Sequence, residues 1–448
     1  MEKPELLSPV QDFTSLKAAI DAGADSIYFG IKELNMRIGA NNFNLKDTKK
    51  VIDLCHKNKV KVYFTLNTII YDDEINKIRA ILKKLKKEKI DAVIAWDFSV
   101  INECNKLNLP IHLSTQANIT NFETIKTLKK QFKNIKRINL ARELSLDQIK
   151  GIIKQIKKNK LNIEIETFIH GAMCVSISGR CFLSQDIFNK SANRGECLQP
   201  CRRKYIIKDV EEDHEFELGT EYVMSPKDLC TIEILDKLIE AKIDAFKIEG
   251  RNRSPEYVKV VTECYREAID IIRNSLSKNL SARGWGTSIK TSRESNRLFP
   301  LLNTKLEINN ETKEYNNELK NKLIKKLKTV YNRGFSTGFY LGKPLNEWSK
   351  AYGSKATKKK IYIGKVKNFY KKIKVAEILV ESNLLKIGDQ IMFQGPTTGV
   401  IEQKIISMQK NHNDIQLAKK GERIAIKTNR IVRQNDKVFL SFPFNIDI

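Results

Sequence analysis

The stretch VKVYFTLNTIIYDDEINKIRAILKKLKKEKIDAVIAWD, residues 60–97, decides the fold class. Its two ends, residues 60–67 and 92–97, are short runs rich in β-branched and aromatic side chains, which is typical of buried strands. Residues 73–87 between them repeat apolar side chains at helical spacing. A strand, a helix and a second strand in this order predict a parallel βαβ unit.

The same alternation extends over the first 275 residues. Strand-like runs separated by amphipathic stretches predict an α/β fold in which a parallel sheet closes into a TIM-like (β/α)8 barrel over residues 1–275. The expected strands are residues 5–8, 26–30, 60–67, 92–97, 111–116, 137–141, 162–170 and 245–249. A ninth run, residues 222–225, is placed outside the barrel, because residues 229–241 serve as the last crossover helix before the final strand.

Polar side chains collect where the expected barrel strands end. Asn67, Gln116, Arg142 and Glu249 each follow or close such a run. In a (β/α)8 barrel the chemistry lies at the C-terminal ends of the strands. We therefore interpret these side chains as a functional rim rather than as ordinary polar turns.

The second part of the chain has a different character. Residues 276–357 predict a linker and a basic helical connection, with a helix within residues 311–329. Residues 358–448 contain short strand-like runs with turn residues between them, which predict a small all-β, barrel-like domain.

The charge is strongly positive. Lysine and arginine number 80 against 53 aspartates and glutamates, which gives a net charge of +27. Such a surplus fits a polyanionic partner, with nucleic acid first, although solvated lysine-rich helices would also produce it. Because the lysine clusters at residues 325–326, 358–360, 371–372 and 419–420 recur in the second half, we expect tRNA to bind along them.

No stretch of sequence has the length of continuous apolar residues that a membrane span needs. The N-terminal residues also lack the pattern of a signal peptide. We therefore expect a cytoplasmic protein with no membrane association, with reduced thiols and without a disulfide-linked partner.

Five of the eight cysteines fall in one stretch, residues 170–230, which predicts a cysteine-rich insertion in the barrel. These five are Cys174, Cys181, Cys197, Cys201 and Cys230. In a reducing compartment such a group indicates a metal or cluster site. The spacing does not match the paired CxxC of zinc ribbons, but thiolates from separate loops can hold an iron–sulfur cluster. Zinc remains the alternative metal.

Around these cysteines the sequence resembles the collagenase-like peptidase family. The stretches that carry the resemblance are ETFIHGAMC (166–174), SGRCFLS (178–184), SPKDLC (225–230), KIEGR (247–251) and YNRGFSTGFY (331–340). The last of these resembles the branch of the family that hydroxylates tRNA. The resemblance covers nearly the whole chain.

The resemblance implies a TIM-like barrel that holds a [4Fe–4S] cluster. The family's ligand pattern carries over onto Cys174, Cys181, Cys197 and Cys230, with Cys201 as the rival ligand. The implied reaction is hydroxylation of the wobble uridine of tRNA to 5-hydroxyuridine, with prephenate as a possible co-substrate. Relatives in the family act on a ribosomal RNA cytidine or in ubiquinone synthesis, so another RNA or a small molecule is an alternative substrate.

Charged residues near the expected mouth of the barrel are candidates for substrate binding. Arginine suits carboxylates and phosphates because its planar fork donates two hydrogen bonds at once. The candidates for binding a dianionic metabolite or a tRNA phosphate are Lys227, Lys247, Arg251 and Arg253, with Glu249 among them as an ion-pair partner.

Two further residues are candidates for proton transfer to the base. Glu166 and His170 both lie at the end of the seventh expected strand. Histidine is the natural choice near neutral pH. The alternative is that His170 only orients a loop.

Proteolysis is the main competing function. The sequence contains neither an HExxH zinc motif nor a GxSxG elbow. His170 and Cys174 could form a Cys–His pair, but nothing marks an oxyanion hole. The neighbouring cysteines make a cluster ligand the better interpretation of Cys174.

Overall fold

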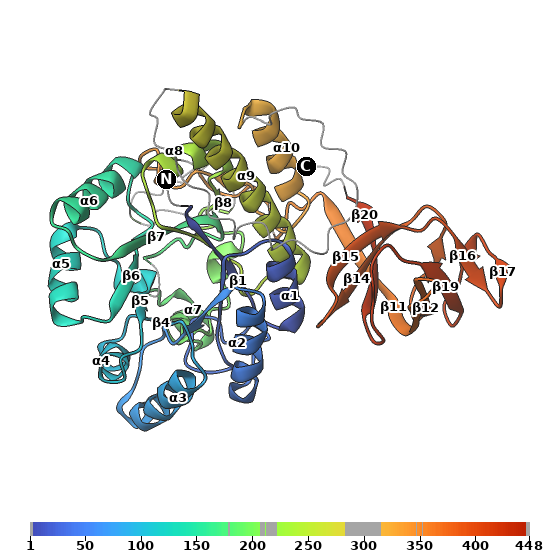
Figure 1. Ribbon diagram of the computed structural model, residues 1–448, viewed down its shortest axis with the longest axis horizontal. Coiled ribbons are helices and arrows are strands. Elements are labelled where there is room, and N and C mark those ends of the chain that lie inside the picture. The colour runs from blue at the N-terminus through green and yellow to red at the C-terminus, as the bar shows by residue number, and fades with distance from the viewer. Residues whose placement is uncertain are drawn as a thin grey trace.

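The computed structural model describes residues 3–177, 180–206, 211, 222–282, 315–345, 347–351 and 353–444. Residues 283–314 of the expected linker and residues 207–210 and 212–221 of the expected cysteine-rich insertion lie outside this part of the chain. Figure 1 shows a ring of strands and helices, and beside it a smaller body made of strands.

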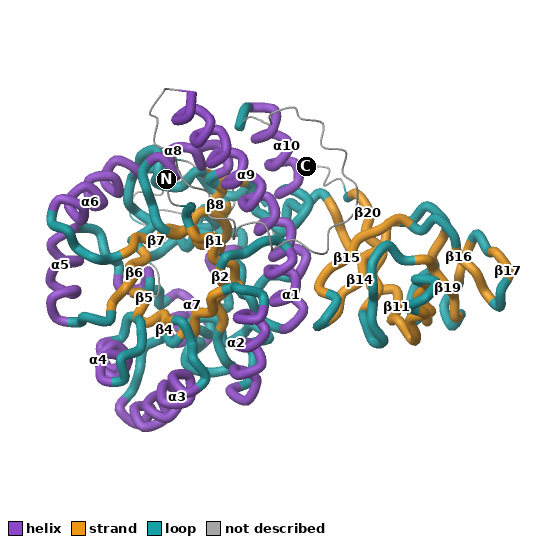
Figure 2. The backbone as a smooth tube through the Cα atoms, viewed as in Figure 1, coloured by secondary structure: helices purple, strands orange, loops and turns teal. Residues whose placement is uncertain are grey.

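Eight parallel strands close into a barrel, which confirms the predicted fold class (Figures 1 and 2). Strands β1 to β7 pair in chain order, and β9 closes the ring by pairing with both β7 and β1. The strands are β1 (Glu5–Pro9), β2 (Ser26–Phe29), β3 (Lys61–Thr65), β4 (Ala92–Ala95), β5 (Ile111–Leu113), β6 (Ile135–Asn139), β7 (Glu164–Gly171) and β9 (Ala245–Ile248).

Helices cover the outside of the barrel (Figure 2). The buried residues of α3 are Ile78, Ile81, Leu82 and Leu85. The apolar residues that repeat at helical spacing in the sequence therefore form the face that packs on the sheet. The barrel helices are α1 (Phe13–Asp21), α2 (Thr48–Lys57), α3 (Ile75–Lys87), α4 (Phe98–Lys106), α5 (Phe122–Gln131), α6 (Leu146–Lys158), α8 (Leu235–Glu240) and α9 (Pro255–Ala282). The last of these runs past residue 275, where the sequence placed the end of the barrel domain.

The segment before α8 differs from the prediction. The ninth run expected at residues 222–225 is a turn, and the extra strand is β8 (Asp228–Cys230). This strand runs antiparallel to the end of β7 and parallel to β10 (Phe335–Ser336). Strand pairing therefore takes residues 229 and 230 out of the helix expected at residues 229–241, which begins only at Leu235.

The C-terminal domain is an antiparallel sheet with its own core, as predicted. Its strands are β11 (Lys358–Tyr370), β12 (Val375–Val380), β14 (Gln390–Gly395), β15 (Gly399–Lys404), β16 (Met408–Lys410), β17 (Asn413–Asp414), β19 (Arg423–Lys427) and β20 (Lys437–Pro443), with β13 (Leu385–Lys386) and β18 (Leu417–Ala418) paired separately. Helix α10 (Asn317–Leu327) lies in the connection between the two domains, within the range expected for a helix.

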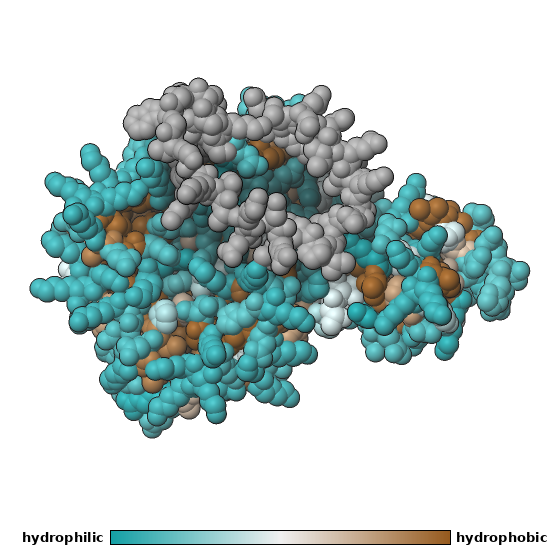
Figure 3. All heavy atoms as spheres, in the orientation of Figure 1, coloured by the Kyte–Doolittle hydropathy of each residue, from teal (hydrophilic) through white to brown (hydrophobic). Residues whose placement is uncertain are grey.

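The β domain docks on the barrel beside α1 and α9 (Figure 1). Ala18 of α1 shares a small apolar cluster with Met392 and Val400. Next to this contact, Lys360 forms an ion pair with Glu256 at 2.9 Å. The described residues on the face shown in Figure 3 are mostly hydrophilic. Among the described residues, no helix is long and apolar enough to cross a membrane.

Candidate functional site

A pocket opens at the C-terminal ends of the barrel strands, where the sequence predicted a functional rim. We call it the mouth pocket. Its polar lining includes Asn67, Gln116, Arg142, Lys247 and Glu249, each at or just after the end of a strand. The complete set of its charged and sulfur-bearing residues is Met36, Arg37, Arg142, Cys174, Cys181, Cys197, Cys201, Lys247, Glu249 and Arg251.

Four of the five clustered cysteines line the mouth pocket: Cys174, Cys181, Cys197 and Cys201. They lie on the long loop between β7 and β8, which includes the short helix α7 (Leu183–Phe188). Hydrogen bonds hold this loop over the barrel. Thr68 donates to the carbonyl of Asn193 at 3.1 Å, and the side chain of Asn193 accepts from the backbone N–H of Cys181 at 3.1 Å.

Burial raises the pKa of the Cys197 and Cys201 thiols. Arg37 opposes this effect at Cys197, and Arg202 opposes it at Cys201. The protein therefore places positive charge beside thiols that must be deprotonated to bind a metal.

Four cysteine thiols on the lining of one pocket are the donor set that a [4Fe–4S] cluster takes. Among the residues that the structure describes, no three His, Cys, Asp or Glu side chains form a group that could hold a metal ion.

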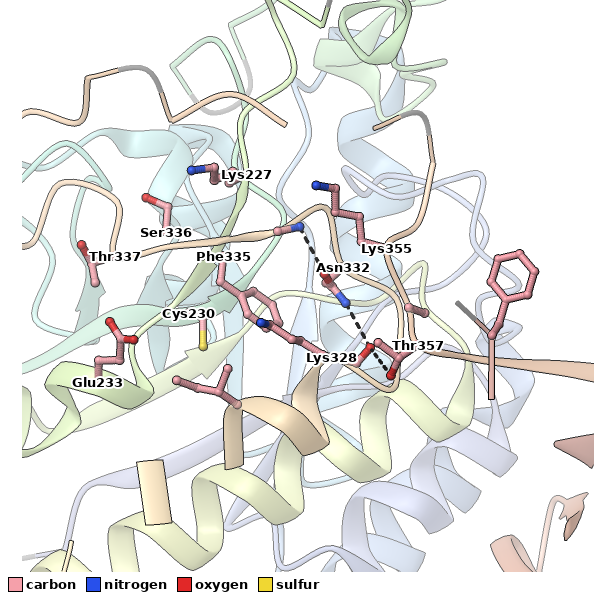
Figure 4. Close-up of a pocket in the computed structure, with 14 residues that line it drawn as sticks. Lys227, Cys230, Glu233, Lys328, Asn332, Phe335, Ser336, Thr337, Lys355 and Thr357 are labelled. Atoms are coloured by element: carbon pink, nitrogen blue, oxygen red, sulfur yellow. Dashed lines mark hydrogen bonds between the residues drawn. The ribbon is translucent and has the colours of Figure 1, made fainter. Parts of the chain in front are cut away.

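Cys230, a predicted ligand, does not line the mouth pocket. It lies on β8, opposite His170 of β7, and its thiol is buried with the Tyr265 hydroxyl 3.8 Å from the sulfur. Burial raises the pKa of this thiol to about 11. Cys230 instead lines a second cavity (Figure 4). Cys201, the rival ligand, therefore lines the same pocket as the other three cysteines, whereas Cys230 does not.

Two arginines in the mouth pocket form no ion pair with a carboxylate among the described residues. Arg251 is 3% exposed and donates to the Thr65 hydroxyl at 2.7 Å and to the Asn35 side-chain oxygen at 2.6 Å. Gly30 makes this position possible, because a Cβ atom at residue 30 would clash with the guanidinium. Burial lowers the pKa of Arg251 to about 10, so the group remains charged at neutral pH.

Arg142 is the second of these arginines. It stacks over the Phe168 ring at 3.8 Å and donates to the Ala172 carbonyl at 2.7 Å. Its Nε is buried and has no hydrogen-bond partner among the described residues. A buried donor without a partner is costly, so an acceptor on a bound ligand would be favourable there.

Glu249 is the carboxylate of the mouth pocket. Arg37 donates to its Oε1 at 2.9 Å. Burial alone would raise the pKa of Glu249, but Arg37, Arg142 and Arg251 together hold it down at about 2. The pocket therefore keeps one anion against several cations and has a net positive charge.

Glu166, a predicted catalytic residue, lies in the barrel interior and does not line the mouth pocket. Its Oε1 accepts from Lys247 at 2.9 Å and from Asn139 at 2.8 Å. Burial lowers the pKa of Lys247, while Glu166 opposes this shift. Lys247 does line the pocket, so Glu166 acts there by fixing the Lys247 ammonium group.

His170, the other predicted catalytic residue, also lies away from the pocket. The pairing of β7 with β9 shifts register between Phe168 and His170, which interrupts the alternation of side chains. As a result Phe168 lines the pocket, whereas His170 packs against Tyr257 and Tyr265 of α9. Burial lowers the pKa of His170 to about 4.

Two of the predicted binding residues are also elsewhere. Lys227 lines the second cavity and pairs with Glu347 at 2.8 Å. Arg253 stacks over the Tyr331 ring at 3.5 Å. The mouth pocket therefore contains Lys247, Glu249 and Arg251 from the predicted binding set.

The binding set predicted from sequence missed Arg37 and Arg142. Arg142 belongs to the strand-end group that the sequence did identify, so its position was available as a signal. Arg37 lies in the connection between β2 and α2, and only its contact with Glu249 reveals its role.

The fold and the site together place this chain in the class of (β/α)8-barrel proteins with cysteines lining the pocket at the strand ends. The family model described as Peptidase family U32 matches residues 11–299, and the chain belongs to that family.

Three relatives show the range of names within the family. A protein named collagenase from Porphyromonas gingivalis is 40% identical, with 97% of each chain covered. A protein named as an uncharacterized protease from Methanocaldococcus jannaschii is 42% identical, with 97% of this chain and 98% of the relative covered. The protein named tRNA hydroxylation protein P1 from Bacillus subtilis is 31% identical, with 88% of this chain and 84% of the relative covered.

Proposed function

We propose that this chain is an enzyme that hydroxylates a base in RNA, and that its specific reaction converts the wobble uridine of tRNA to 5-hydroxyuridine. The single observation that carries the proposal is the mouth pocket, where four cysteines lie together with two arginines that lack a carboxylate partner among the described residues. The name of the Bacillus subtilis relative supports tRNA as the substrate.

The four thiols would hold a [4Fe–4S] cluster through Cys174, Cys181, Cys197 and Cys201. When bound, such a cluster supplies one-electron redox chemistry. The protein contributes the positive charge beside the thiols and the binding groups for substrate.

The unpaired arginines suit a small carboxylate. Arg142 offers a buried Nε without a partner, and Arg251 is a cation held by neutral oxygens. A dicarboxylate such as prephenate would supply a partner for each guanidinium, with Lys247 as a third cation in the same pocket.

The target base would enter from outside the barrel. Phe182 is 72% exposed and follows Cys181 directly, so its ring is free to stack on a base. Other aromatic residues do not offer this surface, because Phe246 and Tyr257 are buried in the core, and Trp285 lies outside the described residues.

Proteolysis is the second candidate because relatives carry the names collagenase and protease. A cysteine or serine protease needs a base beside its nucleophile. Within the described part of the chain, no histidine lines the mouth pocket. His170 lies on the same strand as Phe168, but it is buried against α9.

The test is the modified-nucleoside profile of tRNA from a strain that lacks the gene. We expect 5-hydroxyuridine and its derivatives to disappear, to return with the wild-type gene, and to stay absent with a Cys181→Ser variant. The purified protein should also contain about four irons per chain when prepared without oxygen. An unchanged nucleoside profile, or cleavage of casein by metal-free protein, would overturn the proposal.

A further inference from the structure

A second cavity lies beside the barrel, between β8, α10 and the segment 332–337 (Figure 4). Its volume is about 790 Å³. Three lysines from separate segments line it: Lys227 before β8, Lys328 after α10 and Lys355 before β11. We call it the lysine cavity.

The charges in the lysine cavity are not balanced. Glu233 is the acidic residue among the described residues that line it. Lys227 is paired with Glu347, but neither Lys328 nor Lys355 forms an ion pair with a described carboxylate. In Figure 4, Glu233 and Lys355 lie on opposite sides of the cavity. One side therefore presents lysines that form no ion pair with a described carboxylate.

Neutral polar groups accompany these cations. The hydroxyl residues Ser336, Thr337 and Thr357 also line the cavity. Asn332 holds the neighbouring segment in place, because its side-chain oxygen accepts from the N–H of Gly334 at 3.1 Å while its amide donates to the carbonyl of Val330 at 2.9 Å. Lysines with hydroxyl groups nearby are a typical lining for phosphate.

A groove lies between the mouth pocket and the segment 331–334. Cys197 lines both the mouth pocket and this groove, and Arg203 adds an exposed cation to it. Tyr331 and Arg333 line the groove, whereas Asn332 and Gly334 line the lysine cavity. The groove and the lysine cavity therefore lie on either side of the same short segment.

We propose that the lysine cavity binds the sugar–phosphate backbone of the RNA whose target base enters the mouth pocket. The inference rests on the proposed function and adds the place where the RNA is held. A small anion would occupy one of the two sites. A chain of phosphates is extended and can neutralise cations at neighbouring sites, which favours RNA as the ligand.

The test compares two double variants with the same change in charge. Lys328→Ala/Lys355→Ala removes the cations without ion pairs from the cavity. Lys83→Ala/Lys87→Ala removes two exposed lysines of α3 that do not line it. Binding of unmodified tRNA to the anaerobically purified full chain is measured by fluorescence anisotropy over a range of KCl concentrations.

We expect the cavity variant to bind tRNA more weakly and to lose up to two phosphate contacts. The slope of log K against log salt should then flatten by roughly 0.7 to 0.9 for each contact. The α3 control should keep the wild-type slope. Equal slopes for the wild type and the cavity variant, or equal flattening in both variants, would overturn the inference.

The same experiment separates the two proposals. If the wild type binds tRNA and only the cavity inference fails, the cavity variant behaves like the wild type and the nucleoside profile still changes on deletion. If the wild type shows no salt-dependent tRNA binding, both the inference and the proposed tRNA substrate are wrong.

Discussion

The family resemblance selects Cys230 as the fourth cluster ligand, with Cys201 as the rival, whereas the fold places Cys201 with the other three cysteines. Cys201 lines the mouth pocket with Cys174, Cys181 and Cys197. Cys230 is held on β8 by pairing with His170, and it faces a different cavity. A cluster in the mouth pocket would therefore use Cys201.

The first prediction concerns iron content. Cys201→Ala should lose most of the iron and the brown colour of anaerobically purified protein, because a thiolate ligand is removed. Cys230→Ala is the matched control and should keep both. Iron analysis and the visible absorption spectrum measure the outcome. Retention in the first variant together with loss in the second would reverse the assignment.

A second prediction tests the unpaired guanidinium of Arg142. Arg142→Gln should weaken binding of prephenate by about tenfold or more, because a hydrogen bond between charged groups contributes about 1.5–3 kcal/mol. Arg253→Gln is the control, since Arg253 stacks on Tyr331 outside the mouth pocket. Calorimetric titration with prephenate measures both. Equal affinities in the two variants would contradict a role for Arg142.

At the scale of single elements, strand β7 shows how one extra residue changes the function of a side chain. The register shift between Phe168 and His170 directs Phe168 to the pocket and His170 to α9. His170 then lies among Tyr257, Tyr265 and Phe335, where its charged form is unfavourable.

The third prediction is a pH dependence of stability. Burial lowers the pKa of His170 from 6.5 to about 4, so between these values the unfolded chain binds a proton that the folded chain does not. The contribution of His170 to the free energy of unfolding should therefore be fully present above pH 6.5. The free energy of unfolding should decrease by about 3 kcal/mol as the pH drops toward 4.

Urea unfolding at several pH values tests this effect. A His170→Gln variant should lose this part of the pH dependence, while His412→Gln in an exposed turn of the β domain should keep it. The same fall in stability in the wild type and in His170→Gln would show that another group is responsible.

At the scale of the whole molecule, the lysines of the second domain serve different purposes. Lys360 pairs with Glu256 of α9 and also contacts the ring of Phe439. Lys358 has only a long contact, 3.9 Å, with Glu402. Removing residues 358–360 together would therefore disturb domain docking as well as any RNA contact.

The fourth prediction separates these effects. Lys360→Ala should lower the stability of the full chain by about 1–3 kcal/mol, because it leaves the largely buried Glu256 carboxylate without its cation. Lys358→Ala, the control, should change stability by less than about 1 kcal/mol, as expected for a surface pair. Thermal unfolding measures both variants. Equal loss in the two would show that the Glu256 contact does not stabilise docking.

Much of the architecture follows from local patterns in the sequence. The alternation of apolar runs with amphipathic stretches was enough to predict the barrel and the polar rim, because side-chain period and strand ends are local properties. The clustering of five cysteines in one stretch, residues 170–230, was equally visible. The short strand β8 was not, because a pairing between residues 171 and 229 leaves no local signal.

Only the tertiary structure decides which residues of that rim and loop meet. Sequence spacing along a loop of about fifty residues does not determine distances in space. The pairing of β8 with β7 is what places Cys230 apart from Cys201 in the folded chain. The same holds for Arg37, which reaches Glu249 from a distant connection, and for His170, which one shift in register turns away from the pocket. Contacts between distant segments depend on strand pairing and packing, and these are properties of the folded chain as a whole.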